Sequence, residues 1–356
     1  MIAYYIVFGV LLCGLCLPLV RDDLVRRPFL WAYFVFIFVL LVSFAGLRSP
    51  YIDHDYSDYA TWFSEIQSAS FGAEGLLKDP AFAGVALSLV TVGLTYVFVP
   101  VIYASMALAA KIVLAFSVAT ERAVAIYFFL IFCRFFVLLE MTQIRAAVAI
   151  PLMTLAVYLA CARKPAKAIL LYLLALAFHL SVAAGIPLFI LILCGVSFKS
   201  RMWVLIFAPL AGGVSLVFES ILSQLLGVYR IGEYIGGQDA GDSLSLLSIH
   251  FFMHIGVILF VLVFCWRSLV LFERAAVVYS AFAMFLYSVF ISETTLASRF
   301  EQVFDLFWLS LFIVVFNRIS PKWYLAYLAG IGILGFGLFQ STIGVIKPYA
   351  LWDVPH

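Results

Sequence analysis

The chain has 356 residues, of which 66% are hydrophobic and 11% are charged, and its net charge is +2 at neutral pH. A soluble domain has about 25% charged residues, so this composition excludes an ordinary soluble protein. The small net charge gives no reason to expect a nucleic-acid partner. Runs of about 20 apolar residues recur along the chain, and each can span a bilayer. We therefore predict an all-α polytopic membrane protein with a single transmembrane domain, residues 1–356.

Basic residues gather in short loops on one side of the predicted helices, which identifies that side as cytoplasmic. With this constraint we predict twelve spans and place both termini on the external side. In chain order, the spans are 2–20, 29–47, 97–119, 123–140, 146–162, 165–180, 181–198, 202–220, 249–266, 275–291, 302–317 and 323–342.

The first external loop, 48–80, contains Arg48 followed by a run of alternating carboxylates and tyrosines. Asp55 can act as a base, and Tyr56 and Tyr59 can contact sugars. The alternative is a solvated loop with an interfacial tyrosine belt. The apolar segment 81–96 follows. Counting it as a span would move every later basic cluster to the external side of the membrane. We therefore predict a re-entrant or interfacial helix.

The external ends of the middle spans carry Glu140, Gln143, Arg145 and His179. Charges at this depth are costly unless they are paired or hydrated. Glu140 and Arg145 therefore form a structural ion pair in one interpretation. In the other, Arg145 and Gln143 bind phosphate or sugar. His179 is either a base or anion donor near neutral pH, or an ordinary core histidine.

The second external loop, 221–248, contains Arg230, and a short external turn near the C-terminus is flanked by Glu293 and Arg299. These last two side chains either point into a cavity or anchor the helix at the interface. His250 and His254 have metal-ligand spacing, but no carboxylate accompanies them in register, so we predict no metal site. The mid-span charges Lys111 and Arg134, with Asp305 in a later span, are compatible with a transport path.

Several short motifs, taken in order, resemble the EpsG family, the Wzy-like bacterial exopolysaccharide and O-antigen polymerases. Each motif is weak alone, but their order and predicted external placement match the family across nearly the whole chain. The motifs are Gly46-Leu-Arg48, Asp55-Tyr56 with Tyr59, Gln143-Ile-Arg145, His179-Leu-Ser181 and Ser298-Arg299.

This resemblance implies a GT-C-like membrane glycosyltransferase in the bacterial cytoplasmic membrane, with its active site on the periplasmic or external face. It also implies a donor and an acceptor that are both oligosaccharide repeats on undecaprenyl diphosphate. The growing glycan moves from its lipid diphosphate to the non-reducing end of a new lipid-linked repeat, without metal, nucleotide or other cofactor. A chain-length regulator is a further possible partner.

Under this interpretation the candidate residues divide by role. Guanidiniums stabilise the leaving diphosphate through forked, charge-assisted bonds, and the candidates are Arg48, Arg145, Arg299 and Arg230. The base is one of Asp55, His179 and Glu293, and the sugar contacts are Tyr56, Tyr59 and Gln143. The alternatives are a flippase or transporter for lipid-linked oligosaccharides, and an O-antigen ligase, which would need a larger basic external loop.

Overall fold

The computed structural model describes residues 1–20, 23–52, 55–68, 80–207, 249–291, 294–344 and 349–350. The predicted loop 221–248 with Arg230 lies outside the described residues, and so does Glu293. The chain forms two compact units. The first comprises Met1–Ala156, Ala166–Leu180 and Ile319–His356, and the second comprises Val157–Pro165 and Ser181–Arg318.

Seven helices in the described residues are long and apolar enough to cross a bilayer. A crossing needs about 20 residues, because the hydrocarbon layer is about 30 Å thick and a helix rises about 1.5 Å per residue. The prediction of a helical, membrane-embedded protein is therefore confirmed, whereas twelve spans and a GT-C-like architecture stay predictions. The seven helices are Ile2–Leu19, Arg26–Gly46, Phe98–Val118, Ile144–Cys161, Phe251–Ser268, Leu271–Val289 and Pro321–Ile343.

The other predicted spans correspond to shorter or more polar helices. The region 165–198 is divided into α9 (Pro165–Phe178) and α10 (Ile186–Leu193). The helix α15 (Thr294–Phe316) covers the predicted span 302–317, but it carries Arg299, Glu301 and Asp305. Of the predicted span 202–220, the structure describes residues up to 207, which include the short helix α11 (Met202–Leu205).

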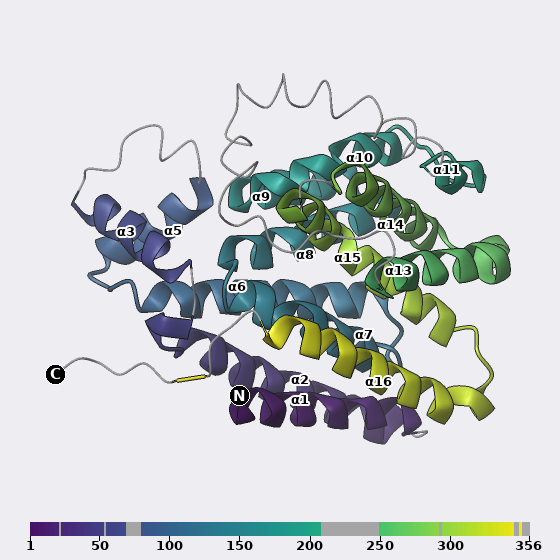
Figure 1. Ribbon diagram of the computed structural model, residues 1–356, viewed down its shortest axis with the longest axis horizontal. Coiled ribbons are helices and arrows are strands. Elements are labelled where there is room, and N and C mark those ends of the chain that lie inside the picture. The colour runs from purple at the N-terminus through teal and green to yellow at the C-terminus, as the bar shows by residue number, and fades with distance from the viewer. Residues whose placement is uncertain are drawn as a thin grey trace. The chain divides into compact units, whose positions relative to one another are not determined.

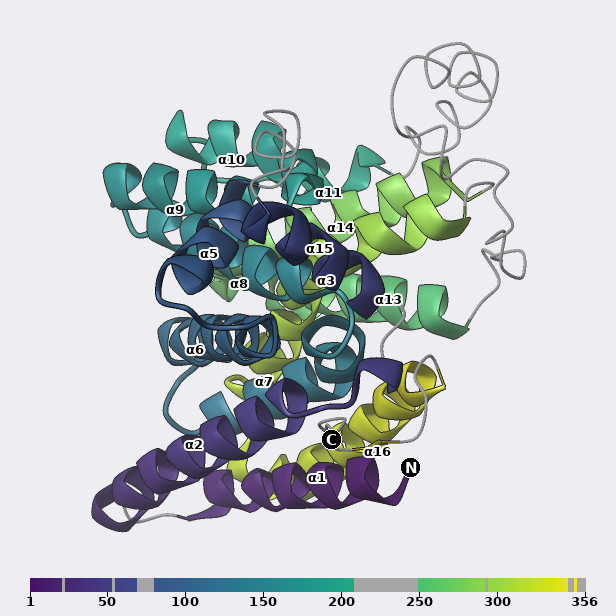
Figure 2. The same cartoon turned by 90° about the vertical axis from the view of Figure 1, so that its left-hand side faces the viewer.

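The centre of the first unit is α7 (Val124–Ile131), which continues into a π-helix, Phe132–Glu140. Every side chain from Ala123 to Val137 is buried, as expected for a segment that is apolar on all sides. Aromatic contacts join this centre to its neighbours, because Phe8, Phe34 and Phe339 each pack against one of its rings. Those neighbours belong to α1 (Ile2–Cys13), α2 (Asp23–Gly46) and α16 (Tyr324–Ile343), as Figures 1 and 2 show.

Two short helices, α3 (Tyr56–Gln67) and α5 (Pro80–Thr91), lie side by side in the first unit (Figure 1). A helix therefore occupies part of the region 48–80 that we predicted as a loop. The end of α5 is set by Gly93, which has φ +76° and donates its N–H to Val90 O, while Leu94 N–H bonds to Leu89 O. Left-handed glycine with these bonds is a helix-ending motif. At 12 residues, α5 is about 18 Å long, which is too short to cross a bilayer.

The glycine of the Gly46-Leu-Arg48 motif allows α2 to approach α6 (Phe98–Val118) closely. A Cβ atom at Gly46 would lie 2.6 Å from Val101 Cγ2 and 3.0 Å from Val101 Cα. We expect Gly46→Ala to lower the free energy of unfolding by about 1–3 kcal/mol through overpacking. Gly84→Ala in α5 is the matched control, because nothing lies within 4 Å of its added Cβ. Denaturant titration of both variants in detergent measures the difference, and equal stability would contradict the expected clash.

The second unit contains a helical hairpin of α14 (Leu271–Val289) and α15, against which α13 (Ile249–Phe260) packs. The stacked rings of Tyr279 and Phe307, with centroids 4.4 Å apart, hold the hairpin together. The Tyr279 hydroxyl also donates a hydrogen bond of 3.1 Å to Gly185 O, which ties α14 to the turn before α10.

Candidate functional site

The guanidinium of Arg145 is held by two aromatic residues of α3. Arg145 lies in the first turn of α8 (Ile144–Cys161). Its Nε donates a long hydrogen bond of 3.4 Å to the Tyr59 hydroxyl oxygen. Its Cζ lies 4.9 Å from the Trp62 ring centroid and 5.4 Å from the Tyr59 ring centroid, which is cation–π distance. A short helix of the predicted external loop thus positions one of the predicted diphosphate ligands.

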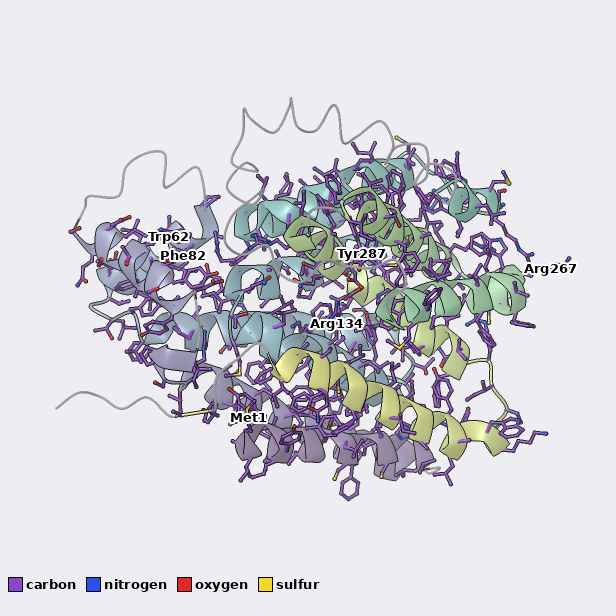
Figure 3. All side chains as sticks on the ribbon, viewed as in Figure 1. Met1, Trp62, Phe82, Arg134, Arg267 and Tyr287 are labelled. Atoms are coloured by element: carbon purple, nitrogen blue, oxygen red, sulfur yellow. The ribbon has the colours of Figure 1, made fainter. Side chains whose placement is uncertain are left out.

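A chain of packed rings connects this group with the end of α9. Trp62 and Tyr59 both contact Phe82 of α5, at centroid distances of 5.8 and 5.7 Å, and Trp62 and Phe82 are seen together in Figure 3. Phe82 in turn contacts Tyr103 of α6, which meets Phe178, the residue immediately before His179. The cluster that holds Arg145 therefore extends to Phe178, the sequence neighbour of the half-buried His179.

Helical spacing relates Asp55 to the two residues of α3 that contact Arg145. Asp55 is the N-cap residue of α3, and Tyr59 and Trp62 follow it by four and seven residues, which is the spacing of one helical face. Its side chain is half-buried, and its carbonyl accepts the Tyr59 N–H at 3.2 Å. A predicted base and a predicted diphosphate ligand are thus both related by spacing or contact to one face of a short helix.

The other two predicted sugar contacts also have defined positions. Tyr56 packs edge-on against Tyr96, with ring centroids 4.9 Å apart. Gln143 is half-buried in the turn before α8, where its backbone carbonyl accepts the N–H of Ala147 at 3.0 Å. Gln143 therefore stays next to Arg145 at the beginning of the helix.

Arg48 is buried in different surroundings from those of Arg145. Only 2% of its surface is exposed, and its Nη1 donates to Ala45 O at 2.5 Å. Next to it, Ser49 N–H bonds to Ala350 O at 2.9 Å, so the C-terminal segment covers this corner. Burial raises the pKa of Tyr349, and the positive charge of Arg48 partly opposes that rise. Arg48 thus contributes positive charge close to the Tyr349 phenol.

A second buried charge in this unit, Glu140, pairs with Lys111 of α6. Lys111 Nζ donates to Glu140 Oε1, and both side chains are almost completely buried. The other carboxylate oxygen, Oε2, has no hydrogen-bond partner among the described residues. The structural ion pair considered for Glu140 with Arg145 is therefore formed with Lys111 instead. A small cavity beside it is lined by Leu41, Leu108, Lys111, Phe128, Ile131, Phe132, Phe136 and Glu140.

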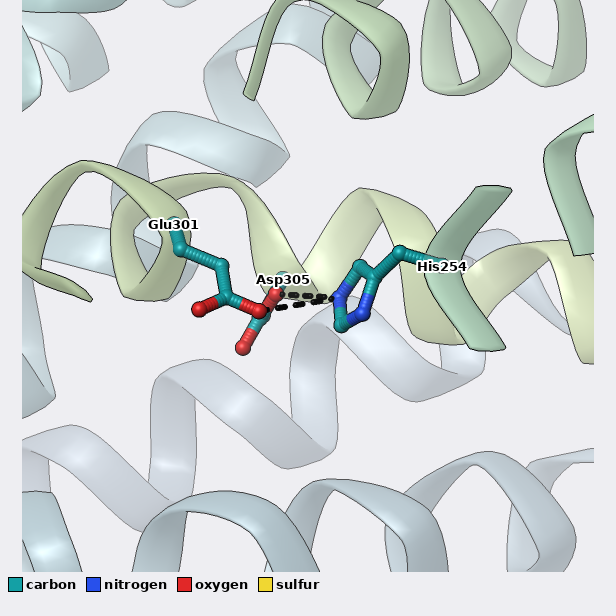
Figure 4. A group of neighbouring side chains, drawn as sticks. All are labelled: His254, Glu301 and Asp305. Atoms are coloured by element: carbon teal, nitrogen blue, oxygen red, sulfur yellow. Dashed lines mark hydrogen bonds and ion pairs between the residues drawn. The ribbon is translucent and has the colours of Figure 1, made fainter. Parts of the chain in front are cut away.

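In the second unit, His254 meets two carboxylates of α15 (Figure 4). Its Nε2 lies 3.0 Å from Asp305 Oδ1 and 3.4 Å from Glu301 Oε1, and all three residues are buried. The imidazole stacks on the Trp308 ring at 3.9 Å. One ligand atom from each of the three residues lies within 4.8 Å of the others, so the group has the donor types and spacing of a divalent-metal site. The same contacts also suit a hydrogen-bonded group of charged side chains that binds no metal.

Two of these features were missed in the sequence. We rejected a metal site at His254 because no carboxylate lies in register with it, but Glu301 and Asp305 reach it from another helix. They are four residues apart on α15, and that spacing is visible in the sequence. Trp62 was not considered, although its spacing from Asp55 and Tyr59 indicates a shared helical face. Arg299, half-buried in the early part of α15, belongs to this second unit, so its convergence with Arg48 and Arg145 stays a prediction.

Comparison with known proteins gives one match. Residues 31–351, nearly the whole chain, match the EpsG family. No curated protein and no solved structure shows significant similarity to the chain. The matched region includes Arg48, Asp55, Arg145, His179 and Arg299. The chain therefore belongs to the EpsG family.

Proposed function

We propose that this protein is a polysaccharide polymerase that joins oligosaccharide repeats carried on undecaprenyl diphosphate. Family membership supports a membrane polymerase of the glycosyltransferase kind. The observation that carries the finer proposal is the oriented guanidinium of Arg145, which belongs to an aromatic cluster that extends to Phe178, the residue before His179. Such a site suits a substrate that combines sugar rings with a diphosphate. We place it on the external face of the bacterial cytoplasmic membrane.

In the proposed reaction, a hydroxyl at the non-reducing end of the new lipid-linked repeat attacks the anomeric carbon of the growing glycan. The bond from that carbon to the diphosphate oxygen breaks, and undecaprenyl diphosphate leaves with the electron pair. The hydroxyl proton passes to a base. Charge grows on the diphosphate oxygens in the transition state, and fixed donors that point at them lower the barrier.

Arg145 is the principal donor in this proposal, and Arg48, Arg299 and Arg230 are further candidates. An arginine suits the role because its planar fork can bind two phosphate oxygens at once. For the base, Asp55 is favoured by its helical spacing from Tyr59 and Trp62, and His179 by its place next to Phe178, the last ring of the cluster. Glu293 is the third candidate. Tyr56, Tyr59 and Gln143 are proposed to contact sugar, with α5 along one wall of the groove for the polyprenyl tail.

We propose further that the reaction needs no metal, because guanidiniums supply the positive charge. Activity is expected to be unchanged after EDTA treatment of the purified, reconstituted protein. Metal analysis of the same sample tests whether His254, Glu301 and Asp305 bind a metal ion. The His254→Gln variant, which lacks one of the three ligands, is the control. Activity that is lost with EDTA, restored by a divalent metal and absent from His254→Gln would contradict metal independence.

The competing transport function was suggested by charges within the spans. Lys111 and Asp305, two of those charges, have buried partners in Glu140 and His254. Such pairing supports a structural role, since a buried charge is tolerated when it is partnered. We therefore favour the polymerase over the flippase.

Reconstitution in liposomes tests this choice. The substrate is a synthetic repeat on undecaprenyl diphosphate, without nucleotide. A polymerase produces a ladder of longer glycans. A flippase instead moves the lipid-linked repeat across the bilayer without lengthening it, and that result would overturn the proposed function.

A further inference from the structure

We propose that the small cavity beside Lys111 and Glu140 is a binding site for one water molecule. The water donates a hydrogen bond to Glu140 Oε2 and accepts one from Lys111 Nζ. The site lies within the first unit and does not depend on the proposed function.

The carboxylate of Glu140 has one oxygen that needs a donor. Oε1 accepts a hydrogen bond from Lys111 Nζ. Oε2 is buried and has no hydrogen-bond partner among the described residues, and the whole residue is 1% exposed. Buried polar atoms in proteins almost always bond to a protein group or to an ordered water, and a charged acceptor is the most costly to leave without a partner. Oε2 therefore calls for a small donor.

The cavity has the size for this donor. Its volume, counted as the space open to the centre of a water molecule, is about 10 Å³. One water needs about 10–15 Å³ of such space, so the cavity admits a single water and excludes a larger solute. Each residue that lines the cavity is exposed by 3% or less, so a bound molecule is held inside the protein.

Lys111 supplies the second polar partner. Its ammonium group has three N–H donors, and one of them bonds to Glu140 Oε1. The Phe135 ring, whose centroid is 5.4 Å from Nζ, can receive another, which leaves a third for the water. A buried water makes two to four hydrogen bonds, and the ion pair provides two. The water would place its oxygen toward the ammonium and a hydrogen toward the carboxylate.

The π-helix explains how a carboxylate reaches this largely aromatic wall. Four residues that line the cavity are spaced by four, namely Phe128, Phe132, Phe136 and Glu140. In an α-helix each such step turns the side chain by about 40°, so three steps would turn Glu140 about 120° away from Phe128. The wider turns of the π-helix, with i→i+5 hydrogen bonds, offset this rotation. Glu140 therefore stays on the face of the three rings.

A structure of the full-length protein, at a resolution that shows ordered water molecules, tests the site directly. We expect one density peak in the cavity, at about 2.5–3.2 Å from both Glu140 Oε2 and Lys111 Nζ. The matched control is Lys111→Met/Glu140→Leu, in which apolar side chains replace both polar partners. The peak should be absent from this variant, because a purely apolar cavity stays dry.

Solid-state NMR in lipid bilayers gives an independent readout. Magnetisation transferred from water to the Glu140 carboxyl carbon, assigned with Glu140→Gln, reports whether water reaches that group. Leu108 and Leu114 both lie three residues from Lys111 on α6 and are both buried, and of the two it is Leu108 that lines the cavity. We expect transfer in wild type and in Leu114→Phe. It should be lost in Leu108→Phe, because the larger ring occupies the space of the water.

Three results would overturn the water site. The first is a cavity without density in a map that shows other buried waters. The second is a peak that persists in Lys111→Met/Glu140→Leu, since the ion pair would then not hold it. The third is unchanged transfer in Leu108→Phe, because the signal would then come from the exchangeable protons of Lys111. The wild-type map decides the question if Leu108→Phe does not fold.

Discussion

Arg145→Ala is expected to abolish polymer formation while the protein remains folded and inserted in the membrane. Arg145 is the predicted diphosphate ligand with the best-defined orientation, fixed by Tyr59 and Trp62. Loss of one preorganised donor to a developing negative charge lowers the rate by about 10²- to 10³-fold. Arg145→Lys is also expected to fail, because lysine carries the charge without the planar fork. The measurement is the rate of glycan lengthening in liposomes.

Arg201→Ala is the control for this prediction, because Arg201 is an exposed arginine at the N-terminus of α11. It should polymerise at the wild-type rate. Thermal denaturation shows whether Arg145→Ala is folded, since its cation–π contacts contribute only modestly to stability. A folded Arg145→Ala protein with near-normal polymerisation would remove Arg145 from the reaction.

Lys111→Met is expected to give the largest loss of stability. The substitution leaves Glu140 charged and without its lysine in an apolar core. Breaking a buried ion pair in this way costs about 3–5 kcal/mol. The double variant Lys111→Met/Glu140→Leu removes both charges and should recover most of the wild-type stability. Denaturant titration of the three proteins in detergent gives the free energies of unfolding.

A single variant as stable as wild type would contradict this account of the pair. So would a double variant that is less stable than Lys111→Met alone, because the loss would then come from packing rather than from the uncompensated carboxylate. A small cavity lies beside both substituted positions.

The helical membrane fold could be predicted from the sequence because each span carries its own signal, a long apolar run. The shorter helices could not be predicted in this way, because an average of hydropathy over many residues does not reveal the single residues at which a helix begins or ends. The end of α5 is set by one left-handed residue, Gly93. The helix α3 lies in a polar stretch that we predicted as a loop, although the spacing of Tyr59 and Phe63, its two buried side chains, is helical.

The candidate site could be predicted only in part, because its contacts join residues far apart in the chain. The order of the motifs selected Arg145 and His179, and the structure places Arg145 against an aromatic cluster whose last ring is Phe178, the neighbour of His179. The partner of Arg145 could not be deduced, since α3 and α8 are separated by several helices. The same reason explains why Glu140 was considered with the nearby Arg145, whereas the structure pairs it with Lys111.

The buried polar groups of the second unit also make contacts between distant parts of the chain, which the sequence does not reveal. The sequence places two histidines on α13, and it places Glu301 and Asp305 on one face of α15. Only the packing of these helices brings His254 to both carboxylates. Side-chain types at helical spacing therefore predicted which faces are polar, and tertiary contacts decided which polar groups meet.

The most direct test of the proposed reaction counts the leaving group. Liposomes with the purified protein receive donor and acceptor repeats on undecaprenyl diphosphate, without metal or nucleotide. Both new glycosidic linkages and free undecaprenyl diphosphate are then quantified. The proposal predicts that one undecaprenyl diphosphate is released for each linkage formed, and that both products disappear together in Arg145→Ala. Linkages formed without release of the lipid, or an unchanged yield of both products in Arg145→Ala, would contradict it.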